Sequence, residues 1–344
     1  MPSLAATIVF FLVGVALVIK GGDLFVSASV AIAYHARIPR VVIGSTLVSL
    51  ATTAPEMAVS ATASLRGSPG LAIGNAVGSA IVNIGFILGV LCVLHPMPVR
   101  ARDFRVPVFA MLAAGILLFL LPQPVREAGR PLEYELKPWT GGLLLLCGAA
   151  YLFTDYWRHR PTTRQLAVPA EPEAATGGHP EPATGRAGAP PMRLRTSILL
   201  FLLGAAIVIG GSRLLTDNAL ELARAMRIPP MIVGLTLVAL GTSLPELVTA
   251  ITSARKGVPE LSLGNVVGAN IMNVTLVTGV AALLSVKPLV MSLATRFYTF
   301  PAMLGIFVLL IILARTGRRL TRAEGVVLMA FYAAYLVGLI LMRE

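Results

Sequence analysis

The sequence predicts an all-α integral membrane protein with ten transmembrane helices, arranged as two inverted repeats of five helices. Of the 344 residues, 56% are hydrophobic and only 13% are charged, and the mean hydropathy is +0.83. A soluble domain normally carries roughly a quarter charged residues. The apolar residues form runs close to the ~20 residues that one helix needs to cross a bilayer. In addition, the stretch 14–90 aligns with 204–280 without a gap.

The apolar runs predict five helices in each half of the chain. The first half contains 5–20, 39–64, 70–94, 104–121 and 139–157, and the second contains 196–215, 229–254, 260–285, 297–314 and 324–342. Because five is an odd number, the second copy must insert with the opposite orientation. Inverted repeats of this kind are used by many secondary transporters.

The repeat is strongest in two motifs. GSTLVSLATTAPE at 44–56 aligns with GLTLVALGTSLPE at 234–246, and GNAVGSAIVNI at 74–84 aligns with GNVVGANIMNV at 264–274. A gapless match of this length does not arise from composition, so each half is expected to build the same structural unit.

The chain divides into three parts. Residues 1–157 form the first five-helix repeat, 158–195 a linker rich in Pro, Ala, Gly, Glu and Arg, and 196–344 the second repeat. A segment of the linker's composition cannot bury a core and is predicted to be disordered. Most Lys and Arg residues fall in connections that share one side of the membrane, which predicts a cytoplasmic linker and termini outside the cell. The protein is therefore expected in the plasma or inner membrane.

Several function classes are disfavoured. The net charge of +12 is spread over short connections and contains no basic stretch interleaved with aromatic residues, so no nucleic-acid partner is expected. The chain has no H-E-x-x-H motif and no histidine inside an apolar run. We therefore expect neither an enzyme nor a cofactor.

Two carboxylates lie deep within apolar runs, at equivalent positions of the two repeats: Glu56 and Glu246. A charge at the centre of a bilayer costs several kcal/mol even on the most permissive scale. Two glutamates cannot neutralise each other, so the counter-charge is expected to be a bound cation or protons. The alternative is a structural pair that hydrogen-bonds to hydroxyl groups.

The residues before each glutamate also favour cation binding. Each glutamate follows a proline, which removes a helical hydrogen bond and is expected to free a carbonyl four residues earlier, at Ala51 and Gly241. Thr52 and Thr242 lie beside these carbonyls. Carbonyl, hydroxyl and carboxylate oxygens are the ligands that hard cations prefer. A hydroxyl that bonds back to its own helix is the alternative for these residues.

The second motif supplies further polar groups within the membrane. Asn83 and Asn273 each follow their glutamate by the same spacing, on the next helix of each repeat, and Ser79 lies on the same helix as Asn83. Either asparagine could bind an ion or form an interhelical hydrogen bond.

The two motifs resemble the α-repeats of the calcium/cation antiporter superfamily, and most closely those of prokaryotic sodium/calcium exchangers. The similarity covers 39–94 and 229–285 as the two α-repeats. It implies a ten-helix antiporter that exchanges Na⁺ for Ca²⁺ by alternating access, with the first and sixth helices sliding across a core of helices 2, 3, 7 and 8.

The resemblance also implies a set of ion ligands. The calcium site would use the two glutamates and the carbonyls of Thr52 and Thr242. The sodium sites would add Ser49 (through its carbonyl), Thr53 and Ser79 in the first repeat, and Ala239 (through its carbonyl) and Ser243 in the second. Ala269 departs from the pattern, since many members have serine there, and Asn273 replaces the acidic residue that accompanies potassium-dependent members.

One further function remains open at this stage, a proton-coupled Ca²⁺ antiporter that uses the same two glutamates. Burial favours the neutral form of a carboxylic acid, which makes proton coupling physically reasonable. The hydroxyl groups around both glutamates favour sodium instead. The oligomeric state and the ion stoichiometry do not follow from the sequence.

Overall fold

The computed structural model describes most of the chain. The described residues are 4–67, 69–99, 101–125, 132–159, 192–225, 239–285, 288–291, 293–316 and 319–341. Nearly all of the predicted linker 158–195 lies outside them, and so does the first part of the predicted helix 229–254.

Six described helices are long and apolar enough to cross a membrane. They are Leu4–Ala36, Gly70–Leu94, Leu194–Leu214, Pro259–Leu284, Thr295–Arg315 and Arg322–Leu341. A further candidate is the broken pair Arg40–Thr52 and Ala54–Leu65, whose two halves meet at a bend of 43°. The chain is therefore a multi-pass membrane protein, whereas the full count of ten helices stays a prediction.

The first half contains one long helix, two composite helices and two simple ones. These are α1 (Leu4–Ala36); α2 (Arg40–Ile43), η1 (Gly44–Val48), α3 (Ser49–Thr52) and α4 (Ala54–Leu65); α5 (Pro69–Val82), η2 (Asn83–Leu88) and α6 (Gly89–Leu94); α7 (Ala101–Leu120); and α8 (Pro138–His159). The η segments are π-helical, with hydrogen bonds from residue i to i+5, and such turns occur frequently at functional sites.

The second half repeats this order in its described part. It contains α10 (Leu194–Ala225); α12 (Ala239–Thr242) and α13 (Leu244–Arg255); α14 (Pro259–Met272), η4 (Asn273–Val277) and α15 (Thr278–Leu284); η5 (Thr295–Thr299) and α16 (Phe300–Thr316); and α17 (Arg322–Leu341). The predicted spans 260–285 and 324–342 agree closely with these helices.

The predicted ends of the first and sixth helices were wrong. α1 continues past Lys20 and Asp23 to Ala36, and α10 continues past the predicted end at 215 to Ala225. The apolar run 5–20 predicted an end near Lys20, but the helix continues, and Gly21 makes a helix contact. A Cβ atom at Gly21 would lie 3.0 Å from the backbone nitrogen of Val208 on α10. The predicted end near Lys20 therefore lies within α1, at a contact with α10.

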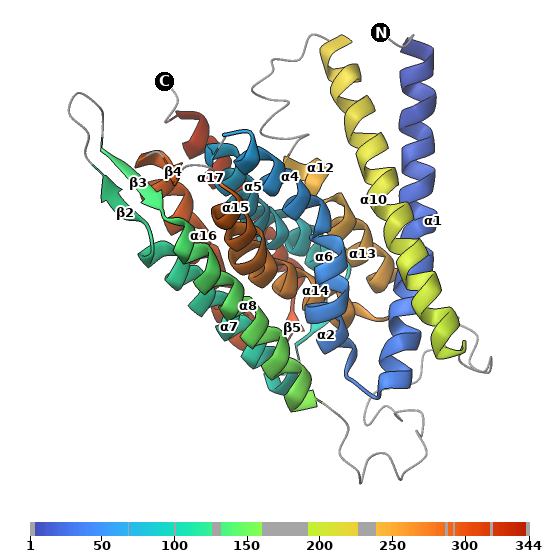
Figure 1. Ribbon diagram of the computed structural model, residues 1–344. Helices are drawn as coiled ribbons and strands as arrows, with labels where there is room; N and C mark the ends of the chain where they lie inside the picture. The colour runs from blue at the N-terminus through green and yellow to red at the C-terminus, as the bar shows by residue number, and fades with distance from the viewer. Residues whose placement is uncertain are drawn as a thin grey trace.

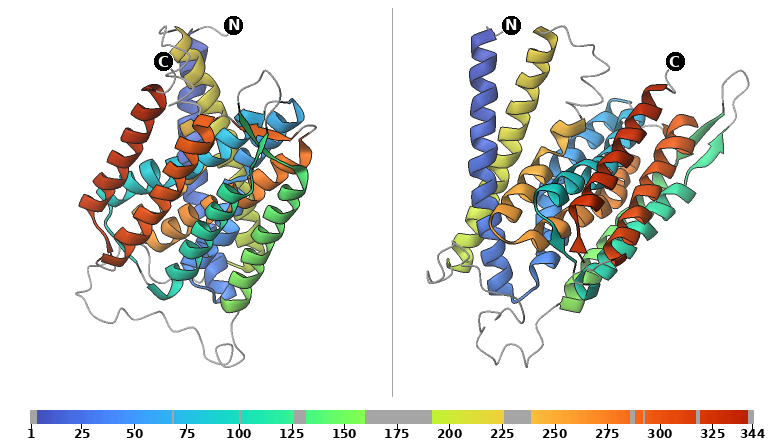
Figure 2. Two further views of the ribbon diagram at one scale, coloured as in Figure 1. Left: turned by 90° about the vertical axis from the view of Figure 1, so that its left-hand side faces the viewer. Right: turned by 180° about the vertical axis from the view of Figure 1, so that it is seen from behind.

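α1 and α10 form a pair of long helices that stands beside the remaining bundle (Figures 1 and 2). The pair is closely packed, because a Cβ atom at Gly204 would lie 2.7 Å from the backbone nitrogen of Phe25. The rings of Phe25 and Phe201 also pack at a centroid distance of 4.7 Å. α1 and α10 therefore form one closely packed pair.

α14 lies at the centre of the bundle (Figure 1), and all of its residues from Leu261 to Met272 are buried. It packs on α2 and η1 through two glycines. A Cβ atom at Gly268 would lie 2.5 Å from the Cα atom of Ser45, and one at Gly264 would lie 2.9 Å from the carbonyl carbon of Val41. Helix pairs in membranes use small residues for such close backbone contacts.

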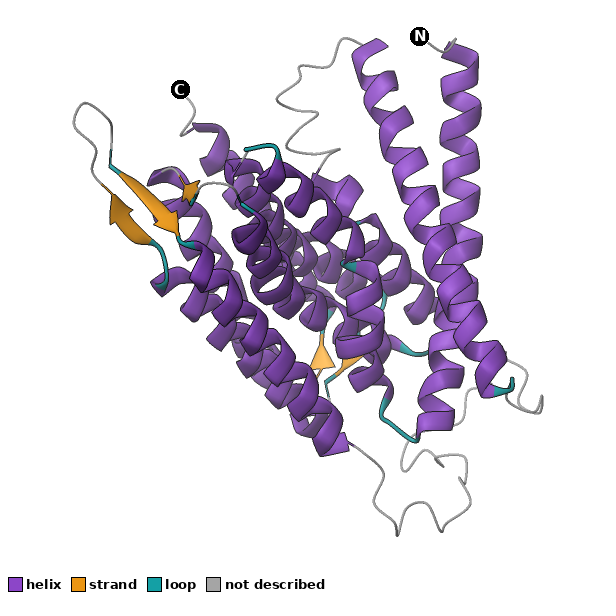
Figure 3. Cartoon of the chain, in the orientation of Figure 1, coloured by secondary structure: helices purple, strands orange, loops and turns teal. Residues whose placement is uncertain are grey.

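The structure also contains short strands, which the all-α prediction missed. β1 (Met97–Pro98) pairs with β5 (Arg319–Leu320), and β2 (Gln123–Val125), β3 (Glu133–Leu136) and β4 (Leu289–Met291) form an antiparallel sheet. Figure 3 shows these strands among the connections at the ends of the helices. Strands of two to four residues are too short to give a periodic pattern of hydrophobic residues.

The start of α1 and the end of α17 lie on the same side of the molecule in Figure 1. The end of α8 and the start of α10, between which the linker runs, lie on the opposite side. Which side of the membrane each end faces stays a prediction.

Candidate functional site

The second and seventh helices are each interrupted just before their glutamate. In the first repeat the interruption is at Thr53 (φ −79°, ψ −3°), and α4 starts at the next residue. In the second repeat it is at Ser243 (φ −93°, ψ 11°), and α13 starts at the next residue. Glu56 and Glu246 therefore both lie in the first turn of a new helix, whose N-terminal end favours negative charge.

The role predicted for the prolines needs a correction. They were expected to interrupt continuous helices and to free carbonyls in the preceding turn. Pro55 and Pro245 instead occupy the first turn of α4 and α13, where a helix has no partner for the backbone N–H that proline lacks. The prolines thus start the second half-helix, and the break itself falls at Thr53 and Ser243.

Both carboxylates are buried, with no exposed surface on Glu56 or Glu246. They are close enough to interact electrostatically with each other. The hydroxyl of Ser243 donates a hydrogen bond to Oε1 of Glu56 at 3.3 Å. Ser243 and Glu56 come from different repeats, so the site is assembled from both halves of the chain.

The reciprocal contact is looser. The hydroxyl groups of Thr52 and Thr53 in the first repeat lie near the carboxylate of Glu246, but neither oxygen of Glu246 accepts a hydrogen bond. Each glutamate thus faces the hydroxyl-bearing residues beside the opposite break. The four hydroxyl residues predicted for the site lie at the two breaks: Thr52, Thr53, Thr242 and Ser243.

A group of buried polar atoms at these breaks and on the following helices lacks hydrogen-bond partners. Those that belong to the residues predicted as ion ligands are Oγ1 of Thr53, Oε2 of Glu56, Oδ1 of Asn83, both carboxylate oxygens of Glu246 and both amide atoms of Asn273. Buried polar atoms are nearly always satisfied in folded proteins. Six of these seven atoms are oxygens, and the seventh is the amide nitrogen of Asn273. Oxygen atoms are the ones that coordinate Na⁺ and Ca²⁺.

The charge of the site also requires a cation or protons. Within the described residues, no Lys or Arg forms an ion pair with Glu56 or Glu246. Two buried carboxylates without a counter-ion would be very costly. The oxygen-rich surroundings are suited to hard cations, which would bind here as transported substrates.

Asn83 and Asn273 occupy equivalent places in the structure. Each is the first residue of a π-helical segment, η2 or η4. The amide nitrogen of Asn83 donates to Oδ1 of Asn270 at 3.1 Å, so an interhelical hydrogen bond exists here and leaves Oδ1 of Asn83 available. The π-helical turns were not predictable from the sequence. η2 continues α5 and η4 continues α14.

Like Asn83 and Asn273, three further predicted ligands are not joined to the carboxylates by any contact in the described structure. The carbonyl of Ser49 accepts the backbone N–H of Thr53 at 2.9 Å, and Ser79 is buried on α5. Ala239 is the first residue of α12. Their roles as ligands stay predictions.

Two asparagines that were not predicted also lie beside the two breaks, Asn75 and Asn265. The hydroxyl of Thr242 donates to Oδ1 of Asn75 at 3.4 Å, and the hydroxyl of Thr52 donates to Oδ1 of Asn265 at 3.2 Å. The signal was present, because a Gly-Asn pair occurs at the same place in both repeats, within an apolar run. Both asparagines connect one repeat to the other beside the site.

A further buried carboxylate, Asp155, was also missed. It has no exposed surface and lies on α8, where one of its oxygens accepts a hydrogen bond from Ser45 on η1 at 3.2 Å. An acidic residue inside the predicted span 139–157 was the available signal. Asp155 joins α8 to the π-helical turn that packs on α14.

Comparisons with known proteins identify the family of this chain. The family described as "Sodium/calcium exchanger protein" matches residues 6–157 and 196–341. The sodium/calcium exchanger MaX1 of Methanosarcina acetivorans is 32% identical over 95% of this chain and 97% of its own length. The putative antiporter CaxA of Alkalimonas amylolytica is 32% identical over 96% of this chain and 98% of its own length.

The structural similarity covers the same extent. A solved structure of the sodium-calcium exchanger NCX_Mj, soaked with zero Na⁺ and Ca²⁺, superposes with a TM-score of 0.78 and 27% identity. The match covers 98% of this chain and 99% of that chain. The relatives of this protein are transporters and not enzymes. The chain belongs to the sodium/calcium exchanger family.

Proposed function

We propose that this protein exchanges Na⁺ for Ca²⁺ across the membrane by alternating access at one site, which contains Glu56 and Glu246. The observation that carries the proposal is the pair of fully buried carboxylates at equivalent helix breaks, with hydroxyl groups of the opposite repeat facing each one. The site lies between the repeats, as in transporters that open alternately to either side.

The exchange follows from charge balance at the site. Two buried carboxylates carry two negative charges, which one Ca²⁺ or two Na⁺ can neutralise. The empty site would leave two unbalanced charges in a medium of low dielectric constant, so its movement across the barrier is expected to be slow. Each ion then crosses only in exchange for the other.

In this proposal Ca²⁺ binds to the two carboxylates and to the carbonyls of Thr52 and Thr242. Na⁺ binds to the hydroxyl groups as well, with Thr53 and Ser243 as further ligands. The remaining members of the proposed ligand set are Ser49, Ser79, Asn83, Ala239 and Asn273. The unpartnered oxygens of Asn83 and Asn273 support their inclusion.

The proposed architecture is ten helices in two inverted repeats, with α1 and α10 sliding as a pair over the bundle. The close packing of α1 on α10 through glycine supports their movement as one unit. The linker 158–195 is placed in the cytoplasm, with both termini outside.

The decisive experiment is Ca²⁺ uptake by proteoliposomes. Purified protein is reconstituted in vesicles loaded with Na⁺, which are diluted into Na⁺-free buffer that contains radiolabelled Ca²⁺. We expect uptake that requires the Na⁺ gradient, does not respond to an imposed pH gradient, and is abolished by Glu56→Gln and by Glu246→Gln. The control is Glu260→Gln, which removes an exposed carboxylate paired with Arg40 and should leave uptake intact.

Two outcomes would contradict the proposal. Uptake driven by the pH gradient alone would show a proton-coupled antiporter that uses the same glutamates. Uptake that survives both glutamine substitutions would show that the ions bind elsewhere.

A further inference from the structure

Asn75 on α5 and Asn265 on α14 occupy equivalent positions, and each contacts a threonine of the opposite repeat. Oδ1 of Asn75 accepts the hydroxyl proton of Thr242, and Oδ1 of Asn265 accepts that of Thr52. The proposed function uses both threonines as ion ligands and assigns nothing to the asparagines. The reciprocal contacts therefore need an explanation of their own.

The amide orientation of Asn75 is determined by its other contacts. Its Nδ2 group donates to the backbone carbonyl of Glu56 at 3.1 Å and to the hydroxyl of Ser60 at 3.0 Å. A carbonyl oxygen can only accept, so the NH₂ group must face Glu56 and the amide oxygen must face Thr242. Asn75 thus supports the backbone of a site glutamate and the hydroxyl of a site threonine at once.

The direction of these hydrogen bonds matters for ion binding. A hydroxyl group has one proton and two lone pairs, and only a lone pair can coordinate a cation. When Thr242 donates its proton to Asn75, its lone pairs face other directions. Thr52 is held in the same way by Asn265, although the carbonyl of Ser49 lies within 3.4 Å as a second acceptor.

The two asparagines differ in one respect. Nδ2 of Asn265 is buried without a partner, because Ala250 stands at the position that corresponds to Ser60 in the first repeat. Asn265 is therefore held at the site by its hydrogen bond with Thr52, whereas Asn75 also forms hydrogen bonds with Glu56 and Ser60.

We propose that Asn75 and Asn265 are positioning residues that hold the hydroxyl groups of Thr242 and Thr52 with their lone pairs toward the transported ions, and that they thereby set the affinity for Na⁺. The inference rests on the proposed function, in which Na⁺ uses these hydroxyl groups and Ca²⁺ uses carboxylates and carbonyls. Loss of the acceptor should therefore weaken Na⁺ binding more than Ca²⁺ binding.

The test measures both affinities on the same protein. Purified Asn265→Leu protein is titrated with Na⁺ and, separately, with Ca²⁺, and the rise in melting temperature gives each half-saturating concentration. The loss of one hydrogen bond should raise the value for Na⁺ about three- to tenfold and leave that for Ca²⁺ within about twofold. Asn265→Gln keeps an amide acceptor for Thr52, adds no charge to the site, and should lie closer to the unsubstituted protein.

The control is Ser262→Ala. Ser262 is a buried residue on the same helix whose hydroxyl bonds to the carbonyl of Ala250 at 2.8 Å; its loss should lower stability without changing the ratio of the two affinities. An unchanged ratio in Asn265→Leu would overturn the positioning role. Ion-dependent stabilisation that survives Glu56→Gln would contradict the proposed function instead, and with it this inference.

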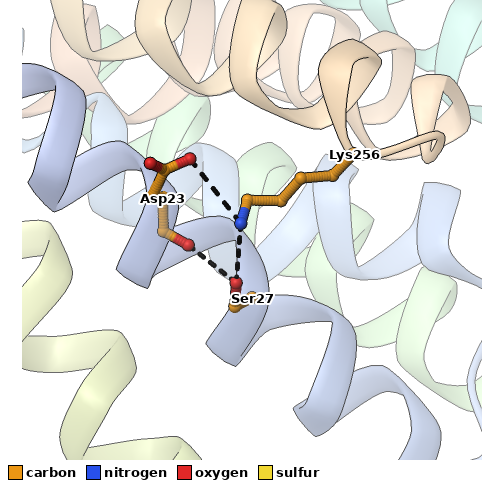
Figure 4. A network of polar contacts seen from close by, with 3 residues as sticks. All are labelled: Asp23, Ser27 and Lys256. Atoms are coloured by element: carbon orange, nitrogen blue, oxygen red, sulfur yellow. Dashed lines mark hydrogen bonds and ion pairs between the residues drawn. The ribbon is translucent and has the colours of Figure 1, made fainter. Parts of the chain in front are cut away.

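A second inference comes from the contact between α1 and the end of α13. Figure 4 shows Lys256 reaching α1, where its Nζ atom lies 3.6 Å from Oδ1 of Asp23 and donates to the hydroxyl of Ser27 at 3.0 Å. Ser27 in turn donates to the backbone carbonyl of Asp23 at 2.8 Å. These residues link the α1–α10 pair to the bundle.

The residues at the equivalent place in the other repeat carry different charges. Asp23 corresponds to Arg213 on α10, and Lys256 corresponds to Arg66 after α4. Arg66 and Arg213 are both exposed. A contact of α10 with the end of α4, the mirror image of the observed one, would bring two arginines together in place of an ion pair.

The mirror contact is sterically possible. A Cβ atom at Gly22 would lie 2.5 Å from Cγ1 of Val248 on α13, so the observed contact needs glycine. At the equivalent place the pair is Ser212 and Ala58, a larger residue opposite a smaller one. The summed side-chain volume of this pair is close to that of Gly22 and Val248, and volume-conserving exchanges are the ones that a packed contact tolerates best. In the described residues α1 packs more extensively on α13 than α10 does on α4.

We infer that the Asp23–Lys256 pair stabilises the state in which α1 lies against α13, and that repulsion between Arg213 and Arg66 disfavours the opposite state. The inference rests on alternating access as proposed above. With the predicted orientation, the stabilised contact closes the cytoplasmic side.

Distances between spin labels test this bias. Labels are placed at Ile19→Cys on α1 and Arg255→Cys at the end of α13, in protein that carries Cys92→Ala and Cys147→Ala. Lys256→Gln should shift the population toward a longer distance by about two- to fivefold, the effect of one exposed ion pair. The charge exchange Asp23→Lys with Lys256→Asp should restore the original distribution.

Arg213→Asp should also favour the longer distance, because it creates an ion pair on the other side. An unchanged distribution in both Lys256→Gln and Arg213→Asp would overturn the inferred bias. A distance that stays single under all Na⁺ and Ca²⁺ conditions in the parent protein would contradict alternating access itself.

Discussion

Replacing Gly268 by alanine should push α14 away from the second helix. The added Cβ atom would lie 2.5 Å from the Cα atom and 2.6 Å from the carbonyl carbon of Ser45. Real Cβ contacts are essentially never shorter than 3.0 Å, and both partners here are backbone atoms that cannot rotate away. The two helices would therefore have to separate by about 0.5–1 Å.

This separation should affect both stability and transport. Overpacking of a filled core costs roughly 1–3 kcal/mol, so the melting temperature in detergent should fall by several degrees. Asn265 lies one turn before Gly268 on the same helix, and its 3.2 Å contact with Thr52 would be stretched. Since displacements of about 1 Å can reduce the rates of precisely arranged sites by about 100-fold, Na⁺-driven Ca²⁺ uptake should fall by at least about tenfold.

The matched control is Gly142→Ala on α8, where an added Cβ atom has no neighbour within 4 Å. Alanine favours a helix over glycine by about 1 kcal/mol, so this variant should melt at the same or a higher temperature and transport normally. If Gly268→Ala melts and transports like the parent protein, the close packing of α14 on η1 is not required for the fold or the site.

Three further predictions concern other parts of the structure. Ser243→Ala removes the 3.3 Å donor to Glu56 and should raise the Na⁺ concentration for half-maximal exchange about tenfold, as a hydrogen bond to a charged group implies; an unchanged value in the uptake assay would argue against a role for this hydroxyl. Asp155→Leu removes one of the two acceptors of the buried Ser45 hydroxyl, the other being the carbonyl of Val42, and should lower the free energy of unfolding by at most about 1 kcal/mol, whereas Asp155→Asn should cost less; equal melting temperatures for the two variants would contradict this. Cys92, which has no exposed surface, should resist maleimide in the folded protein and react after denaturation in SDS, as mass spectrometry of the labelled protein would show.

Much of the architecture could be predicted from the chain alone. Runs of apolar residues determine helices in a membrane, because every backbone polar group must be satisfied within its own segment. The gapless repeat located the two functional motifs, and the cost of buried charge singled out Glu56 and Glu246. These features depend on local composition and on position along one helix.

Helix ends and interruptions were harder to predict. The apolar run 5–20 suggested an end of the first helix near Lys20, but α1 continues to Ala36, and Gly21 packs on α10. The prolines indicated a break in each repeat, and the structure placed it at Thr53 and Ser243. The π-helical turns and the short strands left no periodic signal at all.

Only the tertiary structure decided which groups meet across the two repeats. The bonds of Ser243 to Glu56 and of Thr52 to Asn265 join residues far apart in the sequence, on helices that run past one another. The same holds for Lys256 and Asp23, whose contact brings α1 against α13. Sequence patterns report the period and polarity of one helix, whereas such contacts depend on the distance and rotation between helices, which the packing of the whole bundle determines.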